Sequence, residues 1–143
     1  MKSIQKKSTL VLSVLALMVL FSCKKKEGGS SGNSDEAAAA RVVGTYKGTL
    51  SIAGSTQEYF NAIIVITKEN GNKVKIAPKS GEAYANVTTK IIPIKAIPGS
   101  DDAEAISAPE GTLIYQHSEK AINIVTQTTA SGDVTYTYRA TKQ

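Results

Sequence analysis

Residues 57–77, QEYFNAIIVITKENGNKVKIA, contain the pattern on which the predicted fold rests. Two apolar runs flank Asn70-Gly71, and Asn-Gly is the strongest short hairpin signal because both of its positions tolerate a positive φ. The first run is apolar on both faces, which is typical of a strand that lies deep in a sheet. In the second run Val74 and Ile76 alternate with lysines, as in a strand with one buried face. The stretch therefore predicts two antiparallel strands.

The same alternation continues on the N-terminal side, in residues 44–52, GTYKGTLSI. Tyr46, Leu50 and Ile52 share one face of this predicted strand, while polar side chains occupy the other. Further strands are predicted at 84–97, 112–117, 121–129 and 134–140. Pro93 interrupts the first of these, which reads as two short strands or one bent strand because proline cannot donate to a ladder.

A longer connection, residues 98–110, separates the two halves of this pattern. Asp101 and Glu104 have the spacing of a capping box, which predicts one helical turn at 102–106 before Pro109. The whole pattern gives seven or eight antiparallel strands joined by short turns. Such a series predicts an all-β domain, a sandwich or a barrel, and residues 41–143 are long enough for one such core.

The N-terminus has the features of an export signal. Three lysines precede the apolar run 10–21, whose 12 residues are fewer than the roughly 20 that a membrane-spanning helix needs. The run ends in Leu20-Phe21-Ser22-Cys23, which resembles the lipobox of bacterial lipoproteins. That resemblance implies a signal peptide at 1–22, cleavage before Cys23 and lipidation of its thiol. An ordinary signal peptide beside a free cysteine and an uncleaved span are the competing interpretations.

Residues 23–40 follow as a predicted flexible tether rich in Gly, Ser and charge, in which a helical turn forms only transiently. Lys24 stands where the resemblance would place an inner-membrane retention aspartate, so we expect the outer membrane. The lysines after Cys23 differ from acidic surface-export tags, which favours the periplasmic face.

The net charge of +5 belongs mainly to this N-terminal part. Six of the 17 Lys and Arg, and three of the 12 acids, precede Arg41, which leaves 11 basic and 9 acidic residues from Arg41 onward. A net charge of +2 without a basic stripe argues against a nucleic-acid surface.

Residues 42–52, VVGTYKGTLSI, together with a lipid-anchored N-terminus and about eight strands, resemble the calycin-like or lipocalin-like barrel lipoproteins of Bacteroidetes. The resemblance implies a small closed up-and-down barrel. It aligns Gly44-Thr45-Tyr46 with the family's Gly-x-Trp motif and Arg139 with the arginine that packs over that ring. Alternation along the strand, however, puts Arg139 on the face opposite Tyr138.

Catalytic chemistry has little support in the sequence. His117 is the only histidine and Cys23 the only cysteine, and no nucleophile-elbow, zinc-protease or phosphate-loop motif is present. The connection at 98–110 contains four acidic residues, Asp101, Asp102, Glu104 and Glu110. Their carboxylates could bind calcium weakly, but the pattern favours a solvated acidic loop. We therefore expect no enzyme activity, no cofactor and no metal.

Two functions remain open. A hollow barrel would carry a small apolar ligand in the envelope, lined by Tyr46, Leu50, Ile52, Tyr136 and Tyr138. A solid barrel would instead be an interaction module, an envelope inhibitor or accessory subunit. A cavity favours the carrier, whereas a packed interior with an exposed patch at Tyr59 and Phe60 favours the module.

Overall fold

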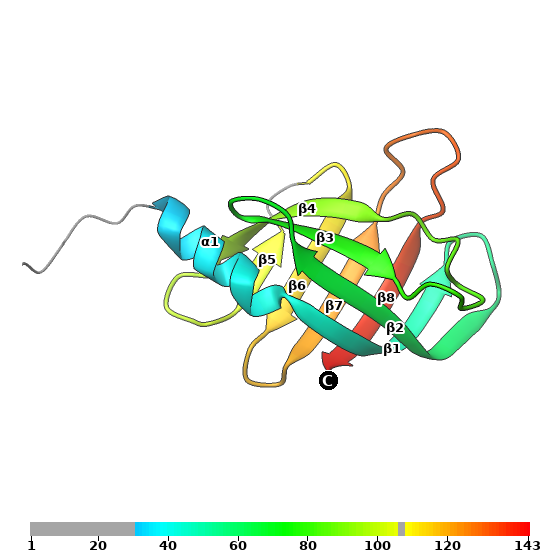
Figure 1. The fold of residues 1–143 in the computed structure, drawn as a ribbon, viewed down its shortest axis with the longest axis horizontal. Coiled ribbons are helices and arrows are strands. Elements are labelled where there is room, and N and C mark those ends of the chain that lie inside the picture. Colours follow the sequence, from blue (N-terminus) through cyan, green and yellow to red (C-terminus); the bar gives the residue numbers. More distant parts are fainter. Residues whose placement is uncertain (1–30, 106–107) are drawn as a thin grey trace, which may run out of the picture.

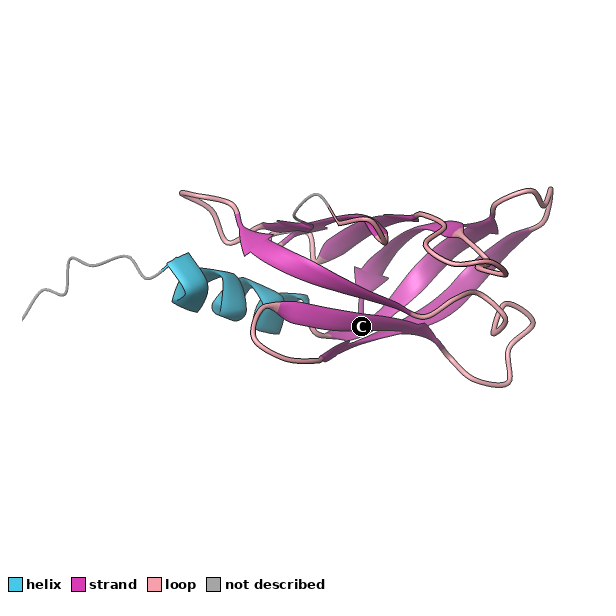
Figure 2. Cartoon of the chain, turned by 90° about the horizontal axis from the view of Figure 1, so that it is seen from above, coloured by secondary structure: helices cyan, strands magenta, loops and turns pink. Residues whose placement is uncertain are grey.

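The computed structural model describes residues 31–105 and 108–143. Within those ranges, eight antiparallel strands follow one another in sequence order around a closed barrel, and one helix lies at an end of it (Figure 1, Figure 2). The predicted all-β class and the small up-and-down barrel are therefore confirmed. The elements are α1 (Ser31–Val42), β1 (Gly44–Ile52), β2 (Glu58–Lys68), β3 (Lys73–Pro78), β4 (Lys90–Ala96), β5 (Ala103–Ala105), β6 (Gly111–Gln116), β7 (Ala121–Thr126) and β8 (Tyr136–Lys142).

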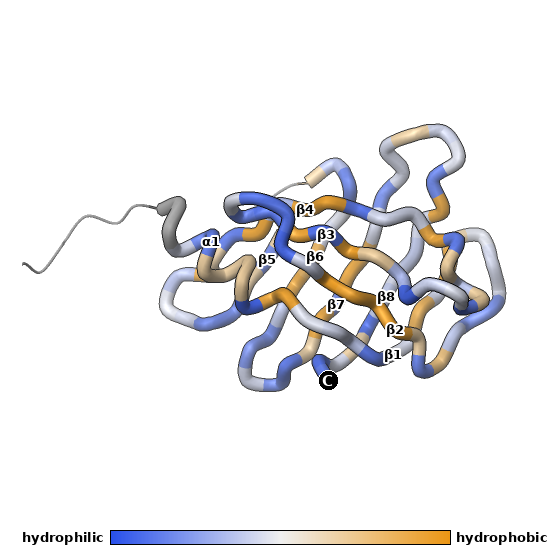
Figure 3. The backbone as a smooth tube through the Cα atoms, in the orientation of Figure 1, coloured by the Kyte–Doolittle hydropathy of each residue, from blue (hydrophilic) through white to orange (hydrophobic). Residues whose placement is uncertain are grey.

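The hairpin of β2 and β3 forms as its sequence predicts. Lys68 pairs with Val74 at the last position of the ladder, and the Lys73 N–H donates to the Asn70 carbonyl at 2.8 Å. This bond makes Gly71 and Asn72 the central residues of the turn. Gly71 has a φ of 51°, in the left-handed region that glycine adopts readily, whereas the φ of Asn70 is not positive. The middle of β2 is a continuous hydrophobic stretch (Figure 3). The turn fixes the register, so this stretch pairs with β1 on one side and β3 on the other.

A β-bulge interrupts the pairing of β1 with β2. Phe60 and Asn61 of β2 stand opposite the single residue Thr49 of β1. Asn61 has a φ of 62°, a conformation that asparagine tolerates better than most residues. The bulge leaves the Phe60 side chain on the outside of the barrel, where it is 70% exposed.

The barrel closes where β1 pairs with β8, from Tyr46 to Ile52. Gly48 allows the two strands to approach closely, because a Cβ atom at this position would lie 2.0 Å from the Arg139 carbonyl oxygen. Alternate side chains of every strand fill the interior. The largest fully buried strand residues are Tyr46, Leu50, Ile64, Ile66, Ile76, Ile92, Ile94, Leu113, Ile124, Tyr136 and Tyr138.

Helix α1 covers the end of the barrel at which β2 and β4 finish, which we call the proximal end (Figure 2). Its contacts are mainly with β4. Ala38, Ala39 and Val42 are fully buried, and the Tyr46 hydroxyl donates to the Val42 carbonyl at 2.7 Å. We call the opposite end, where β4 and β8 begin, the distal end.

The expectation of a flexible tether over residues 23–40 is wrong from Ser31 onward, where α1 begins. Alanine has the highest helix propensity, but a short helix becomes stable mainly through packing. Here the Ala96 N–H donates to Asp35 Oδ1 at 2.9 Å, and Lys68 Nζ lies 2.6 Å from Glu36 Oε1. The alanine run therefore favours a helix only weakly on its own, and its docking on the barrel makes the helix persistent.

The helical turn predicted at 102–106 is also wrong. Residues Ala103–Ala105 instead form β5, which pairs with β4 and β6. Asp102 Oδ1 accepts the His117 N–H at 2.8 Å, so this carboxylate joins two barrel segments. Closing the barrel requires a strand between β4 and β6, and that tertiary pairing overrides the local capping signal.

Of the predicted segment 84–97, Lys90–Ala96 alone is a strand, and the residues before it belong to a loop. Pro93 remains within β4. It pairs with Lys73, the first residue of β3, and precedes Ile94, the first residue of β4 that pairs with β5. Its missing N–H therefore falls at the margin of both ladders, where proline is tolerated.

The stacking of Arg139 on Tyr46, which the lipocalin-like resemblance implied, is wrong. Arg139 is exposed and pairs with Thr49, whereas Tyr46 pairs with Lys142. The alternation of β8 is regular, so Arg139 follows the inward Tyr138 and turns outward.

The predicted signal peptide, residues 1–22, and the lipidation site at Cys23 lie outside the described residues. In the part of the chain that the structure describes, no helix has the length and hydrophobicity that crossing a membrane requires.

Candidate functional site

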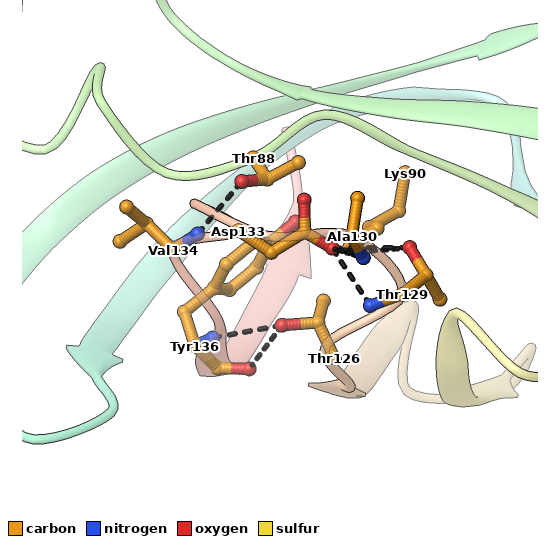
Figure 4. Close-up of polar contacts among 8 residues, drawn as sticks. All are labelled: Thr88, Lys90, Thr126, Thr129, Ala130, Asp133, Val134 and Tyr136. Carbon is orange, nitrogen blue, oxygen red and sulfur yellow. Dashed lines mark hydrogen bonds and ion pairs between the residues drawn. The ribbon is translucent and has the colours of Figure 1, made fainter.

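A polar cluster lies at the distal end, beneath the loop 127–135 that joins β7 to β8 (Figure 4). Lys90 stands at the start of β4, Thr126 at the end of β7 and Tyr136 at the start of β8, while Asp133 comes from the loop. Because neighbouring strands are antiparallel, these positions meet at one end of the barrel. The cluster therefore combines residues that are distant in the sequence.

Lys90 is a lysine in the barrel interior, with 3% of its side chain exposed. It alternates with the buried residues Ile92 and Ile94, so the pleat of β4 turns it inward. Its ammonium donates to Asp133 Oδ2 at 2.5 Å and to Thr129 Oγ1 at 3.0 Å. An unpaired charge would be strongly unfavourable here, so these acceptors are what hold Lys90 inside.

Asp133 is the acceptor around which the loop folds. Its Oδ2 accepts the backbone N–H groups of Thr129 at 2.8 Å and Ala130 at 3.2 Å, and the Thr129 hydroxyl at 3.0 Å. The hydrogen bond from Lys90, followed by that from the Thr129 N–H, lowers the pKa of Asp133 below its ordinary value. We call Lys90, Thr129 and Asp133 the clasp, because their contacts hold the loop over the distal end.

The clasp predicts how stability changes in acid. Folding lowers the pKa of Asp133, so below about pH 4 the unfolded state binds more protons at this group than the folded state does. The stabilisation is complete above the unfolded-state pKa and is lost as the pH falls toward the folded-state pKa. Melting temperatures of the wild type and Asp133→Asn should differ most above about pH 5 and approach one another below about pH 4. A difference that is constant with pH would contradict this assignment.

Tyr136 is held through its backbone. Thr126 Oγ1 accepts the Tyr136 N–H at 2.7 Å and donates to the Tyr136 carbonyl at 3.1 Å (Figure 4). The Tyr136 hydroxyl is buried, and it has no hydrogen-bond partner among the described residues. Burial raises the pKa of Tyr136, so the hydroxyl keeps its proton and remains an available donor.

A second loop, residues 79–89, is bonded to the first. The Val134 N–H donates to Thr88 Oγ1 at 2.8 Å, and the Thr88 N–H donates to the Val134 carbonyl at 3.0 Å. Two loops that join different strands are thus fastened to each other over the distal end.

The residues predicted to line a lumen lie in the interior, where they are packed against protein. Tyr46, Leu50 and Tyr138 have no accessible surface and Tyr136 retains 1%, whereas Ile52 is only partly buried near the distal end. A side chain without accessible surface adjoins no void that a water molecule could enter. The Tyr138 hydroxyl lies 2.8 and 2.9 Å from two backbone carbonyls, of β1 and β2, to which it donates. The structure therefore brings these residues together as a core.

The candidate metal ligands do not converge. His117 is exposed, and its ring meets Tyr115 edge-on with centroids 6.1 Å apart. Asp101 lies beside Arg41, at 4.0 Å. Among the described residues, no three His, Cys, Asp or Glu side chains are grouped as a metal site would require.

Sequence reasoning missed the clasp, although one signal was present. Lys90 precedes Ile92 by two positions and Ile94 by four, so the alternation of a strand places all three side chains on the same face. An inward position is therefore predicted for a charged residue. Asp133 follows Ser131 and Gly132 in a turn, where an aspartate is ordinary. Nothing local pairs it with a lysine 43 residues away.

Comparison of the chain with protein-family models, with curated proteins and with solved structures gave no match.

Proposed function

We propose that this protein is a non-enzymatic interaction module of the bacterial envelope, anchored to the outer membrane by a lipid on Cys23. In this proposal the barrel is a solid scaffold, and recognition takes place on its outside. The supporting observation is the interior: Tyr46 and Tyr138 have no accessible surface, and their hydroxyls are bonded to backbone carbonyls. Helix α1 covers the proximal end and the clasp closes the distal end.

The distal cluster is structural in this proposal. An amine is a nucleophile or a base only when its lone pair is free. The Lys90 ammonium donates to Asp133 and Thr129, so this buried group serves to hold a loop.

The bulge offers an apolar surface feature to a partner. Phe60 is 70% exposed, while Tyr59 is partly buried and packs edge-on against Tyr84, with centroids 5.5 Å apart. The patch expected at Tyr59 and Phe60 thus consists mainly of Phe60. Exposed aromatic side chains are enriched among the residues that dominate binding in protein interfaces.

The proposed anchor orients the domain. Residues 24–30 lie between Cys23 and the start of α1, and seven residues span at most about 25 Å. The proximal end would then face the membrane, and the distal loops would face away from it. We place the domain on the periplasmic side, because residues 24–26 are lysines and not an acidic export tag.

Cys23→Ala tests the anchor. Only the thiol can accept a diacylglyceryl group, so the variant should incorporate no fatty-acid analogue and should keep its N-terminal 22 residues. Labelling in cells followed by mass spectrometry gives both readouts. Equal labelling of the variant and the wild type would refute the lipoprotein proposal.

The Tyr136 hydroxyl, buried and without a partner in the part of the chain that the structure describes, favours a second candidate function, a lipocalin-like carrier of a small ligand in the envelope. Such a ligand would have to open the clasp and displace packed side chains. Native mass spectrometry of protein extracted from membranes separates the two functions. The module predicts the mass of the acylated chain alone, whereas a stoichiometric bound small molecule would overturn the solid-barrel proposal.

A further inference from the structure

Four consecutive strands of the closed barrel, β6, β7, β8 and β1, contain no aspartate or glutamate. Two long cationic side chains point outward from them, Lys47 on β1 and Arg139 on β8. Both are exposed, and among the described residues neither forms an ion pair. The positive charge on this side of the barrel is therefore not neutralised locally.

The strand register places these two cations around a hollow. Thr141 pairs with Lys47 on one side and with Ala121 on the other, while Arg139 pairs with Asn123. Short side chains thus occupy the middle of the surface, and longer ones stand at its margins. The result is an open hollow of about 420 Å³, lined on its polar side by Lys47, Thr49, Gln116, Asn123, Arg139 and Thr141.

The polar residues that line the hollow are mostly hydrogen-bond donors or cations, so the hollow suits a ligand that carries hydrogen-bond acceptors and negative charge. A guanidinium and an ammonium suit carboxylates, the former as a planar fork that can bind both oxygens. The surrounding hydroxyl and amide groups supply neutral donors. The residues that line the hollow include no aromatic ring on which a sugar could stack.

We propose that this cationic face, defined by Lys47, Arg139 and the hollow between them, docks an acidic segment of a protein partner. A partner carboxylate would lie over Ala121 and Thr141, within reach of both cations. The inference rests on the proposed role as an interaction module and assigns the surface and the partner chemistry to it. Charge complementarity selects an acidic occupant, and the absence of stacking rings from the hollow selects a peptide over a glycan.

The test uses the purified full-length, acylated protein in a nonionic detergent and a fluorescein-labelled octaglutamate peptide. Fluorescence anisotropy should show binding that weakens as the salt concentration rises from about 20 to 200 mM, because exposed charges are screened. A labelled octaglutamine peptide should not bind. The double variant Lys47→Glu/Arg139→Glu should weaken octaglutamate binding at least about tenfold, and Lys47→Gln/Arg139→Gln should give an intermediate loss.

The matched control is Lys73→Glu/Lys75→Glu. These lysines are exposed on the outer face of β3, and the substitution changes the net charge by the same amount. It should change the affinity less than about twofold. Equal losses in the two double variants would show attraction to net charge alone and would overturn the proposal, as would a lack of octaglutamate binding by the wild type.

Dextran sulfate distinguishes the other class of partner. If it binds through Lys47 and Arg139 while octaglutamate does not, the surface recognises an acidic glycan and the protein partner is refuted. Melting temperatures confirm that each variant is folded. Lipidation and the ligand-free mass are measured separately, so a failure here is distinguishable from a failure of the proposed function.

Discussion

Tyr138→Ala is expected to lower the free energy of unfolding by about 4 kcal/mol, the range found when a buried aromatic side chain is truncated to alanine. Tyr138 has no accessible surface. Its hydroxyl reaches the carbonyls of Tyr46 and Ala62 at 2.8 and 2.9 Å, beside the bulge. The truncation therefore removes the ring and also leaves buried acceptors without their donor. Urea unfolding followed by circular dichroism measures the loss.

Two further variants separate the contributions of the ring and the hydroxyl. Tyr138→Phe keeps the ring and should lose only about 1 to 3 kcal/mol, the effect of leaving a buried acceptor unpaired. Thr137→Ala, at the exposed neighbouring position of β8, should change stability by about 0.5 kcal/mol or less. If Thr137→Ala and Tyr138→Ala had similar effects, the inward register assigned to β8 would be wrong.

Ala39→Asp is expected to detach helix α1 from the proximal end. Ala39 is fully buried against the barrel, and a carboxylate there would be an unpaired buried charge. The loss should be about 2 to 3 kcal/mol, the upper part of the usual range for a single substitution. It cannot exceed the free energy of docking the helix, because undocking exposes the carboxylate to water. A chain that begins at Arg41 should therefore melt at a temperature close to that of Ala39→Asp.

Ala40→Asp is the matched control for this helix. Ala40 is exposed, and the change from alanine to aspartate lowers helix propensity equally at both positions. The control should lose less than about 1 kcal/mol. Equal melting temperatures for the Ala39 and Ala40 variants would mean that α1 does not pack on the barrel in solution.

The sequence predicted the strands whose signals are local. The hairpin at Asn70-Gly71 and the alternation that places Tyr46 and Leu50 on one face involve residues adjacent or nearly adjacent in the chain, and both predictions were confirmed. The number of strands left both a sandwich and a barrel open, and only the resemblance implied a closed barrel. The resemblance implied that Arg139 stacks on Tyr46, whereas the alternation of β8 predicted that Arg139 faces outward. The structure agrees with the alternation.

The remaining features depend on contacts between distant segments. The alanine run of α1 resembled part of a tether because its docking site, β4, lies about 60 residues away. The strand β5 has only three residues and exists because β4 and β6 each need a partner. In the candidate site, the spacing of Lys90 from Ile92 and Ile94 indicated that Lys90 faces the interior. Its partner Asp133, however, is an ordinary turn residue in the sequence.

Pairing of the first strand with the last also determines when the protein can finish folding. Tyr46 and Tyr138, which meet across that seam, are separated by 92 positions, and contacts of long sequence separation form slowly because a large loop must first close. At a synthesis rate of 5 to 20 residues per second, β1 waits on the order of ten seconds before β8 exists. During that interval the nascent chain cannot complete its barrel. If the chain is exported unfolded, as the proposed lipid anchor requires, this delay keeps it competent for translocation until its last strand has been made.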